Sequence, residues 1–309
     1  MNILIVNPKA GYGKAQKLFE RLKKDPLYKQ KNCRAFFTEY AGHAEKIAEQ
    51  VVEIHHESLA CIFVLGGDGT LHEVINGTKK RPSIPIAFVP AGSGNDFARG
   101  IGTRKKGVEL FRKMITHPKI VHLHQGVFVP NQRYQRGSRY FANSIGFGLD
   151  GKIVSAANRP VFRKWMQRLY LQKFIYTLAL LRLLKNYEPI TVELQIDEKT
   201  MQFANAAMVT VTNHPYYGGG MKITPKMHIQ HPGFHVLVID SISKWKILGL
   251  FLTVFFGTHT KLKEVSVREA HTVKVSSEQP LPYQIDGQSG ECMESDIKKS
   301  GTKRTFYSA

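Results

Sequence analysis

The sequence has few cysteines and no long apolar run, which excludes several classes of protein at once. Cys33, Cys61 and Cys292 are too few and too scattered for a disulfide framework or a zinc site, and inert thiols are typical of a reducing compartment. The longest apolar stretches, 169–184 and 247–257, fall short of the ~20 residues that a helix needs to cross a bilayer. The apolar N-terminus lacks the basic region of a signal peptide. We therefore expect a cytoplasmic protein.

Acidic residues are also scarce. The chain of 309 residues has 24 Asp and Glu against 44 Lys and Arg, which gives a formal net charge of +20. Such an excess favours polyanionic partners, namely nucleic acid, anionic lipid headgroups or phosphate-rich ligands. The charge alone does not choose among them. Hydrophobic residues make up 42% of the chain, which is enough for a packed core.

Apolar segments and helical patterns alternate in the first part of the chain. Residues 2–6, 34–38, 60–65 and 84–89 have the pattern of strands, and residues 44–54 have apolar side chains at helical spacing. Strands that alternate with helices indicate a parallel α/β sheet. We predict an α/β nucleotide-binding domain over residues 1–124.

Beyond this point, successive strands are separated by turns. The predicted strands are 121–129, 140–145, 190–196, 203–212, 234–239, 265–267 and 271–275. Helices are predicted over 159–184 and 244–256. This pattern indicates an antiparallel β-sandwich, which we place at residues 125–309 as an acceptor domain.

The sharpest motif is the loop Gly66-Gly67-Asp68-Gly69-Thr70, which lies between a predicted strand and a predicted helix. Glycines let backbone N–H groups approach phosphate oxygens closely, and the helix N-terminus adds partial positive charge. Asp68 can hold Mg²⁺ or orient a nucleophile. Thr70 and Glu73 have the spacing of a capping box, which would fix the start of the helix. The alternative is an ordinary tight turn between strand and helix.

A second loop, 90–99, follows the next strand and has the same plan of glycines, a small hydroxyl and a carboxylate. Loops at successive strand ends converge at the carboxyl edge of a parallel sheet, where α/β proteins bind ligands. Standard nucleotide fingerprints do not fit this region, because no segment supplies a Walker A motif. The segment 146–151 matches G-x-G-x-x-G, but residues 165–171 lack the acidic residue that should follow it, so we interpret the match as chance.

Taken in order, the motifs resemble the diacylglycerol kinase catalytic family, which includes soluble bacterial lipid kinases and the sphingosine and ceramide kinases. The likeness covers nearly the whole chain. The matching residues are Asn7-Pro8-x-Ala10-Gly11, Thr38, Ala41-Gly42-His43-Ala44, Gly66-Gly67-Asp68-Gly69-Thr70 with Glu73 and Asn76, Gly92-Ser93-Gly94-Asn95-Asp96-Phe97-Ala98-Arg99, Asn143 with Gly146-Phe147-Gly148-Leu149-Asp150, Asn213-His214-Pro215-Tyr216-Tyr217-Gly218-Gly219-Gly220 and Asp286-Gly287.

The resemblance implies an NAD-kinase-like α/β domain followed by a β-sandwich, with ATP and Mg²⁺ as cofactors. Asp68 and Asp96 would form the acidic, metal-linked catalytic centre. The implied ATP-binding residues are Asn7, Pro8, Lys9, Ala10, Gly11, Thr38, Gly66, Gly67, Asp68, Gly69, Thr70, Glu73 and Ser93. Phosphoryl transfer needs mainly positioning and charge neutralisation, which such loops and carboxylates can supply.

This sequence departs from the family's pattern in three places. Gln288 stands where the family has a Glu thought to remove the proton of the acceptor hydroxyl, and an amide cannot take a proton. Asp286-Gly287 is also a common hairpin turn. The acidic residues that hold a structural metal in the loop after Pro225 are replaced by residues 230–233, so that metal site looks lost. His124 stands in place of an expected Asp; His122 and His124 could pair on a metal, although alternating histidines on a strand are usually structural.

Basic residues interleaved with aromatic ones favour an anionic membrane surface as the place of work. The segment 158–173 contains Arg159, Arg163, Lys164, Trp165, Arg168 and Lys173, and a second basic loop covers residues 132–136 and Arg139. A helix of this composition suits a membrane interface, and a solvated basic face over packed apolar residues is the alternative. We expect a peripheral membrane protein that acts on a lipid, with a homodimer as one possible state.

Four functions remain open from the sequence. The first is a kinase that phosphorylates a hydroxyl of diacylglycerol or a related lipid. The second is a nucleotide-binding regulator on the same fold, which Gln288 favours. The third is a kinase for a soluble acceptor, as in the distantly related NAD kinases. The last is a nucleic-acid binder; without an RRM, KH or helix-turn-helix signature, we do not expect nucleic acid as the partner.

Overall fold

The computed structural model of the protein describes residues 1–131, 137–159, 161–162 and 175–309. The chain forms two compact units, one of Met1–Gln125 with Ser300–Ala309 and one of Gly126–Lys299. The C-terminal segment therefore returns to the first unit, whereas the sequence assigns all of 125–309 to the second domain.

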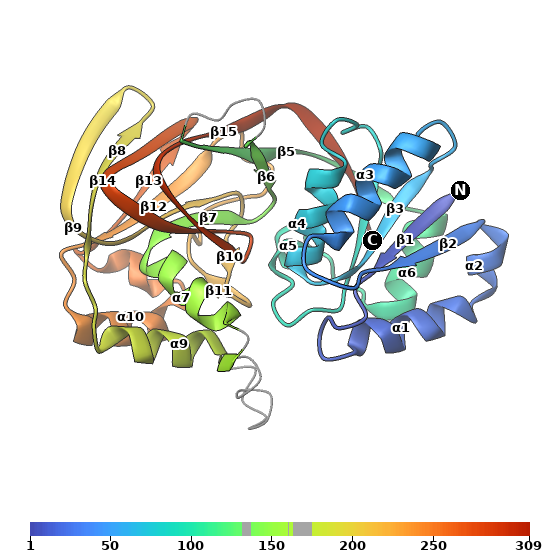
Figure 1. The fold of residues 1–309 in the computed structure, drawn as a ribbon, viewed down its shortest axis with the longest axis horizontal. Coiled ribbons are helices and arrows are strands. Elements are labelled where there is room, and N and C mark those ends of the chain that lie inside the picture. The colour runs from blue at the N-terminus through green and yellow to red at the C-terminus, as the bar shows by residue number, and fades with distance from the viewer. Residues whose placement is uncertain (132–136, 160, 163–174) are drawn as a thin grey trace. The chain divides into compact units, whose positions relative to one another are not determined.

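A parallel sheet forms the centre of the first unit. Its strands are β1 (Asn2–Val6), β2 (Cys33–Phe37), β3 (Cys61–Gly66) and β4 (Ile86–Pro90), in the order β4-β3-β1-β2. Apart from Asn2, β1 and β3 consist of apolar residues and glycine, and both are buried along their whole length, as expected for strands that are covered on both faces. The predicted parallel α/β fold is confirmed (Figure 1).

Helices cover both faces of this sheet. They are α1 (Lys14–Lys23), α2 (Pro26–Gln30), α3 (His43–His55), α4 (Asp68–Gly77), α5 (Asp96–Gly100) and α6 (Gly107–Thr116). Phe19 of α1 and Phe111 of α6 pack with Leu4, Phe63 and Val89 of the strands, while α3 and α4 lie on the opposite face (Figure 1). Successive strand residues point to opposite faces, so each strand contributes side chains to the packing on both faces of the sheet.

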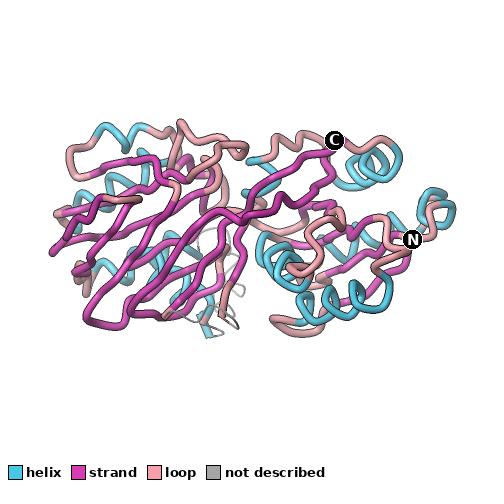
Figure 2. Tube along the Cα trace, turned by 90° about the horizontal axis from the view of Figure 1, so that it is seen from above, coloured by secondary structure: helices cyan, strands magenta, loops and turns pink. Residues whose placement is uncertain are grey.

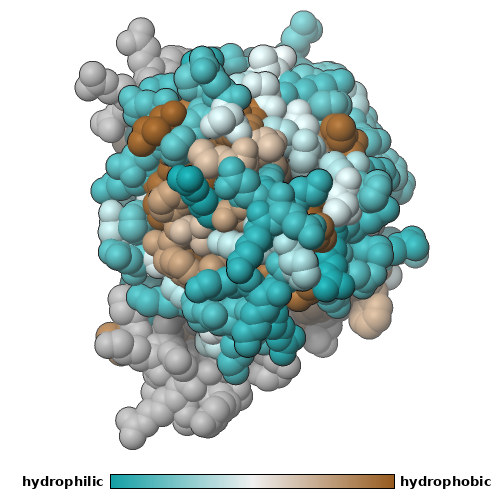
Figure 3. Space-filling model, turned by 90° about the vertical axis from the view of Figure 1, so that its right-hand side faces the viewer, coloured by the Kyte–Doolittle hydropathy of each residue, from teal (hydrophilic) through white to brown (hydrophobic). Residues whose placement is uncertain are grey.

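β2 is the edge strand of this sheet, and Phe36 and Phe37 near its end are exposed. On the side of the molecule that Figure 3 shows, an apolar area lies among hydrophilic residues. Exposed edge strands are sites where another chain can pair.

The C-terminal segment completes the first unit. β15 (Gln288–Ser308) pairs in parallel with β4 through Phe306 and Ile86, and Phe306 also contacts Phe97. The buried guanidinium of Arg304 donates from Nε to Gln125 Oε1 (2.8 Å) and from an Nη atom to the carbonyl of Thr78 (3.0 Å). A buried charge is tolerated only when it is hydrogen-bonded in this way.

The second unit is built on antiparallel strands. These are β5 (Lys119–Pro130, from Gly126 onward), β6 (Arg139–Phe141), β7 (Ser144–Gly148), β8 (Ile190–Ile196), β9 (Lys199–Thr212), β12 (Phe234–Asp240), β13 (Val265–Ala270), β14 (Thr272–Ile285) and the first part of β15, with the small hairpin β10 (Tyr216–Tyr217) and β11 (Met221–Lys222). The main order is β13-β12-β9-β7-β14-β15, and β8 pairs with β14 and β9. Figure 2 shows these strands side by side.

Two apolar cores hold this unit together. One lies among the strands and includes Phe128, Phe147, Val211 and Val275. The other joins the sheet to the helices α7 (Leu149–Asn158), α9 (Ile175–Leu184) and α10 (Lys244–Val254), next to the 3-10 turn η2 (Thr258–Lys261). The antiparallel sandwich prediction is confirmed. The predicted helix over 159–184 lies partly outside the described residues.

Candidate active site

Three loops meet at the carboxyl edge of the parallel sheet. They follow β1, β3 and β4, whose ends are in register, because Val6 pairs with Leu65 and Leu65 pairs with Val89. The N–H groups of Ala91 and Gly92 donate to the carbonyl of Gly66 (2.7 and 3.1 Å). The two glycine loops predicted from the sequence are therefore joined backbone to backbone.

Glycine is required where these loops touch. A Cβ at Gly92 would lie 2.5 Å from the Cα of Gly67, and a Cβ at Gly11 would lie 1.9 Å from the carbonyl oxygen of Ala91. Gly11 also has a φ of 57°, a conformation that favours glycine. The chain can bring three loops this close only without side chains at these positions.

The carboxylate of Asp68 links the second loop to the third. Oδ2 accepts from the N–H of Asp96 (3.0 Å) and Oδ1 accepts from the N–H of Phe97 (3.1 Å). These donors are the first amides of α5, whose orphan N–H groups need acceptors. Asp96 itself is buried, and its Oδ1 accepts from Arg99 (2.9 Å). The structure thus brings Asp68 and Asp96 together, as the sequence predicts.

The loop after β1 is tied to the same cluster. Asn7 Nδ2 donates to Thr70 Oγ1 (3.0 Å), and Lys9 Nζ donates to the carbonyl of Glu39 (3.3 Å). Thr38 is buried at the end of β2, where its N–H donates to Val6 (2.9 Å).

Pro8 and Ala10 lie in the turn after β1, and Gly69 lies in the first turn of α4. Ser93 is exposed in the loop after β4.

The capping-box prediction for Thr70 and Glu73 is wrong. α4 begins at Asp68 after Gly67, without a side-chain cap. The carboxylate of Glu73 instead accepts from the N–H groups of Gly42 (2.9 Å) and Ala44 (3.0 Å) at the start of α3. T-x-x-E spacing cannot distinguish a cap on its own helix from a cap on a neighbour. Glu73 therefore fixes α3 and the chain after Thr38 beside the loop cluster.

In the second unit, Gln288 opens β15 directly after a two-residue turn. Ile285 pairs with Gln288 across the turn, and Asp286 and Gly287 both have positive φ (47° and 88°), as in a type I′ hairpin. The turn is more than a hairpin, because the Asp286 carboxylate accepts from the N–H groups of Ala142, Asn143 and Ser144 (2.8, 2.8 and 3.1 Å). The half-buried Gln288 thus stands on a rigid corner.

A buried polar network lies beside this corner, and none of its residues was predicted to act in a site. His214 Nε2 lies 2.7 Å from Asn143 Oδ1, and Lys299 Nζ donates to Asn213 Oδ1 (2.8 Å). Burial lowers the pKa of His214 to about 4, with Asp286 acting in the opposite direction. Burial likewise lowers the pKa of Lys299 to about 8. Such shifted values gather at functional sites.

The glycine match at 146–151 has a packing explanation. A Cβ at Gly146 would lie 1.5 Å from Asp150 Oδ2, and one at Gly151 would lie 2.5 Å from the backbone of Pro282. Tyr217 Oη donates to one oxygen of Asp150, and Gln284 Nε2 donates to the other (3.2 Å). Burial raises the pKa of Asp150 to about 6, against both hydrogen bonds. These glycines make room for a buried acid and for β14.

The two histidines of β5 contact the C-terminal strand. His124 Nδ1 lies 2.7 Å from the carbonyl of Ser300, and His122 Nδ1 lies 3.2 Å from Thr305 Oγ1, so both rings contact β15. The basic positions 132–136 and Arg163, Lys164, Trp165, Arg168 and Lys173 lie outside the described residues. Within the described ranges, no helix is long and apolar enough to cross a membrane.

Comparison with known proteins decides the family. The model of the diacylglycerol kinase catalytic domain matches residues 2–122, and that of the YegS C-terminal NAD kinase beta sandwich-like domain matches residues 143–295. A Bacillus subtilis protein named "Putative lipid kinase YtlR" is 31% identical over 286 residues, which cover 92% of each chain. The chain belongs to the diacylglycerol kinase catalytic family.

A further relative and two solved structures are also similar to the chain. A diacylglycerol kinase of Staphylococcus carnosus is 26% identical over 93% of this chain and 88% of its own. A crystal structure of a diacylglycerol kinase from Bacillus anthracis covers 100% of this chain and 96% of its own, with a TM-score of 0.71 and 21% identity. Yeast NADH kinase in complex with NADH has a TM-score of 0.56 at 11% identity, over 100% of this chain and 83% of that one. The chain thus shares its fold with these two structures.

Proposed function

We propose that this family member transfers the γ-phosphoryl group of ATP to a hydroxyl of diacylglycerol or a related lipid. The observation that carries the proposal is the meeting of three glycine-bearing loops around Asp68 and Asp96, in a chain that belongs to a lipid kinase family. In phosphoryl transfer, the protein's work is almost entirely positioning and charge stabilisation.

The loops supply the nucleotide site in this proposal. Backbone N–H groups of Asn7–Gly11 and Gly66–Thr70 would hold the phosphates, together with Lys9, Ser93 and the N-terminus of α4. Glu73 has no direct contact with the nucleotide in this proposal, because both of its carboxylate oxygens accept from N–H groups at the start of α3. It is a positioning residue for Thr38 and the chain that follows β2.

Asp68 and Asp96 fit a magnesium site. Mg²⁺ is usually bound by one or two carboxylates together with substrate phosphates and water, and this pair offers hard oxygen donors on neighbouring loops. When bound, the ion would neutralise charge that develops on the transferred group. Backbone N–H groups hold Asp68, and Arg99 holds Asp96, so both acids are fixed before any ligand arrives.

Gln288 supports a second candidate, a nucleotide-binding regulator that transfers phosphate slowly or not at all. Its amide can hydrogen-bond a hydroxyl but cannot accept the proton, and general-base help is worth ~10²–10⁴-fold. The loose transition state of phosphoryl transfer still permits turnover without a strong base. We therefore keep the kinase as the first candidate and expect it to be slow.

For the lipid, we propose that α10 provides part of the membrane contact. On α10, Trp245 is 77% exposed and Leu248 is also exposed; directly after the helix, Phe256 is 81% exposed and Phe255 is exposed as well. Lys244 and Lys246 flank Trp245. Buried Ile247, Leu250 and Val254 hold the other side of the helix. Aromatic and basic residues on one exposed segment suit the headgroup region of an anionic membrane.

A labelling experiment identifies the acceptor. The purified chain is incubated with γ-labelled ATP, Mg²⁺ and a mixed-lipid extract, and the products are partitioned between organic solvent and water. The lipid kinase predicts label in the organic phase. A labelled water-soluble product would indicate a soluble acceptor, and ATP binding without transfer would indicate the regulator.

A further inference from the structure

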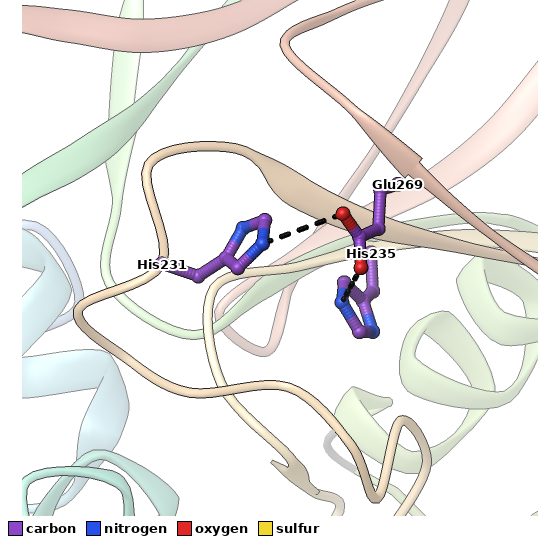
Figure 4. A group of neighbouring side chains, drawn as sticks. All are labelled: His231, His235 and Glu269. Carbon is purple, nitrogen blue, oxygen red and sulfur yellow. Dashed lines mark ion pairs between the residues drawn. The ribbon is translucent and has the colours of Figure 1, made fainter.

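Two histidines and a glutamate meet at the edge of the sheet in the second unit. His231 lies in the loop before β12, His235 lies on β12 and Glu269 lies on β13. His235 and Glu269 are direct partners across the two strands, and β13 is the edge strand. Figure 4 shows both imidazole rings directed at the carboxylate.

The distances are too long for hydrogen bonds. His231 Nε2 lies 3.6 Å from Glu269 Oε2, and His235 Nε2 lies 3.6 Å from Glu269 Oε1, whereas N–H···O bonds are about 2.7–3.2 Å long. Two donors that each bind one tetrahedral ion at about 2.1 Å lie roughly 3.4 Å apart. All three ligand atoms are within 4.8 Å of one another. The two contacts are ion pairs in this structure, and their spacing also leaves room for a shared cation.

We propose that His231, His235 and Glu269 bind a divalent transition-metal ion of the zinc class, with water in the open position. Two imidazole nitrogens and one carboxylate suit Zn²⁺, whereas Mg²⁺ requires oxygen ligands. The sequence predicts only that an acidic site at residues 230–233 is lost. The structure adds that histidines here meet a glutamate from another strand, which no spacing in the sequence reveals.

The rings are already oriented for this role. His235 is buried, and its Nδ1 has no hydrogen-bond partner among the described residues. His231 Nδ1 accepts from the N–H of Gly233 (3.1 Å), which turns Nε2 toward Glu269. A neutral ring that binds the ion through Nε2 carries its proton on Nδ1, so this bond from Gly233 is lost. One neutral hydrogen bond is weak beside the coordination that replaces it.

The ion would crosslink the edge strand β13 to β12 and to the loop before β12. The loop that carries His231 passes close to β13, because a Cβ at Gly233 would lie 2.4 Å from the carbonyl oxygen of Ala270. Binding ties this loop and β12 to β13 through three side chains. Because the three ligands are brought together only in the folded state, the ion binds that state more tightly than the unfolded chain and stabilises the second unit as its concentration rises.

The test titrates Zn²⁺ into the untagged full-length chain after removal of metals with a chelator. Calorimetry gives stoichiometry and affinity, and thermal unfolding gives the shift in Tm. Glu269→Gln is the first variant, since its side chain is 70% exposed and should not disturb folding; His231→Gln is the second. His56→Gln, at an exposed histidine of the first unit, is the matched control, because the chain has 13 histidines that can bind Zn²⁺ weakly.

We expect one equivalent of Zn²⁺ and a higher Tm for the wild type and for His56→Gln, and an excess of Mg²⁺ should not displace the Zn²⁺. Both cluster variants should bind at least about tenfold more weakly and lose the shift in Tm. The amide resonance of Gly233 should move on binding in the wild type. Absence of stoichiometric binding, or equal binding in all four proteins, would overturn the proposal.

Discussion

At the scale of single residues, Asp68 illustrates how one carboxylate serves structure and chemistry together. Its two oxygens accept from the first amides of α5, and the same group is a candidate metal ligand. We expect Asp68→Asn to lower kcat by about 10²-fold or more, since a fixed charge at the transferred phosphoryl group is lost. It should also destabilise the protein by about 1–3 kcal/mol, because an amide satisfies only one of the two N–H groups.

Asp25→Asn is the control for this variant. Asp25 is buried, accepts from the N–H of Leu27 and pairs with Arg112, so it shares the structural role without lying among the glycine loops. It should lose comparable stability and keep its turnover. Normal kcat in Asp68→Asn would remove Asp68 from the catalytic centre.

Gln288 is the position where the two candidate functions differ most. Gln288→Glu supplies a base at nearly constant size, so kcat should rise about tenfold, equivalent to about 1.4 kcal/mol, while KM changes little. The rise should follow ionisation of the new carboxylate in a pH profile. If the wild type already turns over fast and Gln288→Glu does not raise kcat, another group is the base. Glu291 is the next candidate.

His214 makes stability depend on pH. Its pKa is lowered from 6.5 to about 4 by burial, so the folded state resists protonation, and its stabilising contribution is lost as pH falls from 6.5 through 4. A shift of this size corresponds to something on the order of 3 kcal/mol. Denaturant unfolding of His214→Gln should show a shallower acid loss than the wild type. Asp150, with its pKa raised to about 6, acts in the opposite direction in both proteins, and parallel curves would contradict the assignment.

The candidate site was largely predictable at this scale, apart from how its acids are used. Asp68, Asp96 and the glycines stand at strand ends that a parallel sheet brings together, so local pattern was sufficient. Glu73 was predicted to cap α4, but it caps α3, a long-range partner that spacing does not encode. The network of Asn213, His214 and Lys299 joins distant strands, so only a tertiary structure could reveal it.

At the scale of elements, α10 carries the membrane hypothesis among the described residues. Trp245→Ala with Phe256→Ala removes exposed apolar side chains without touching buried Ile247 and Leu250. We expect this variant to bind anionic vesicles several-fold more weakly and to keep its affinity for ATP, since it loses apolar area at the interface. Ile54→Ala, an exposed apolar residue on α3, is the control. Equal vesicle binding by all three proteins would assign α10 to solvent.

Strands and helices with strong periodicity were predicted well, and the rest depended on tertiary contacts. β1, β3 and β4 are apolar runs bounded by glycine or proline, and α10 matches its predicted range nearly to the residue. α7 was not predicted, because its first turn looked like part of a glycine motif. Asp150 in that turn is buried beside Tyr217 and Gln284, partners that lie far away in the sequence.

At the scale of the whole molecule, the chain ends in the unit where it begins. Arg304 and Phe306 are buried with Gln125, Thr78 and Phe97. The strands predicted from the sequence end at residue 275, so neither β15 nor its return to the first unit was expected. Any truncated form of the catalytic domain must therefore keep residues 300–309.

Lipid phosphorylation by this chain of 309 residues is tested most directly by one measurement. Purified protein is mixed with γ-labelled ATP and vesicles that contain diacylglycerol and an anionic lipid, with and without Mg²⁺, and phosphorylated lipid is quantified over time. We predict a slow rate that requires Mg²⁺ and is abolished by Asp68→Asn. No phosphorylated lipid from the wild type under these conditions, with ATP bound, would contradict the account.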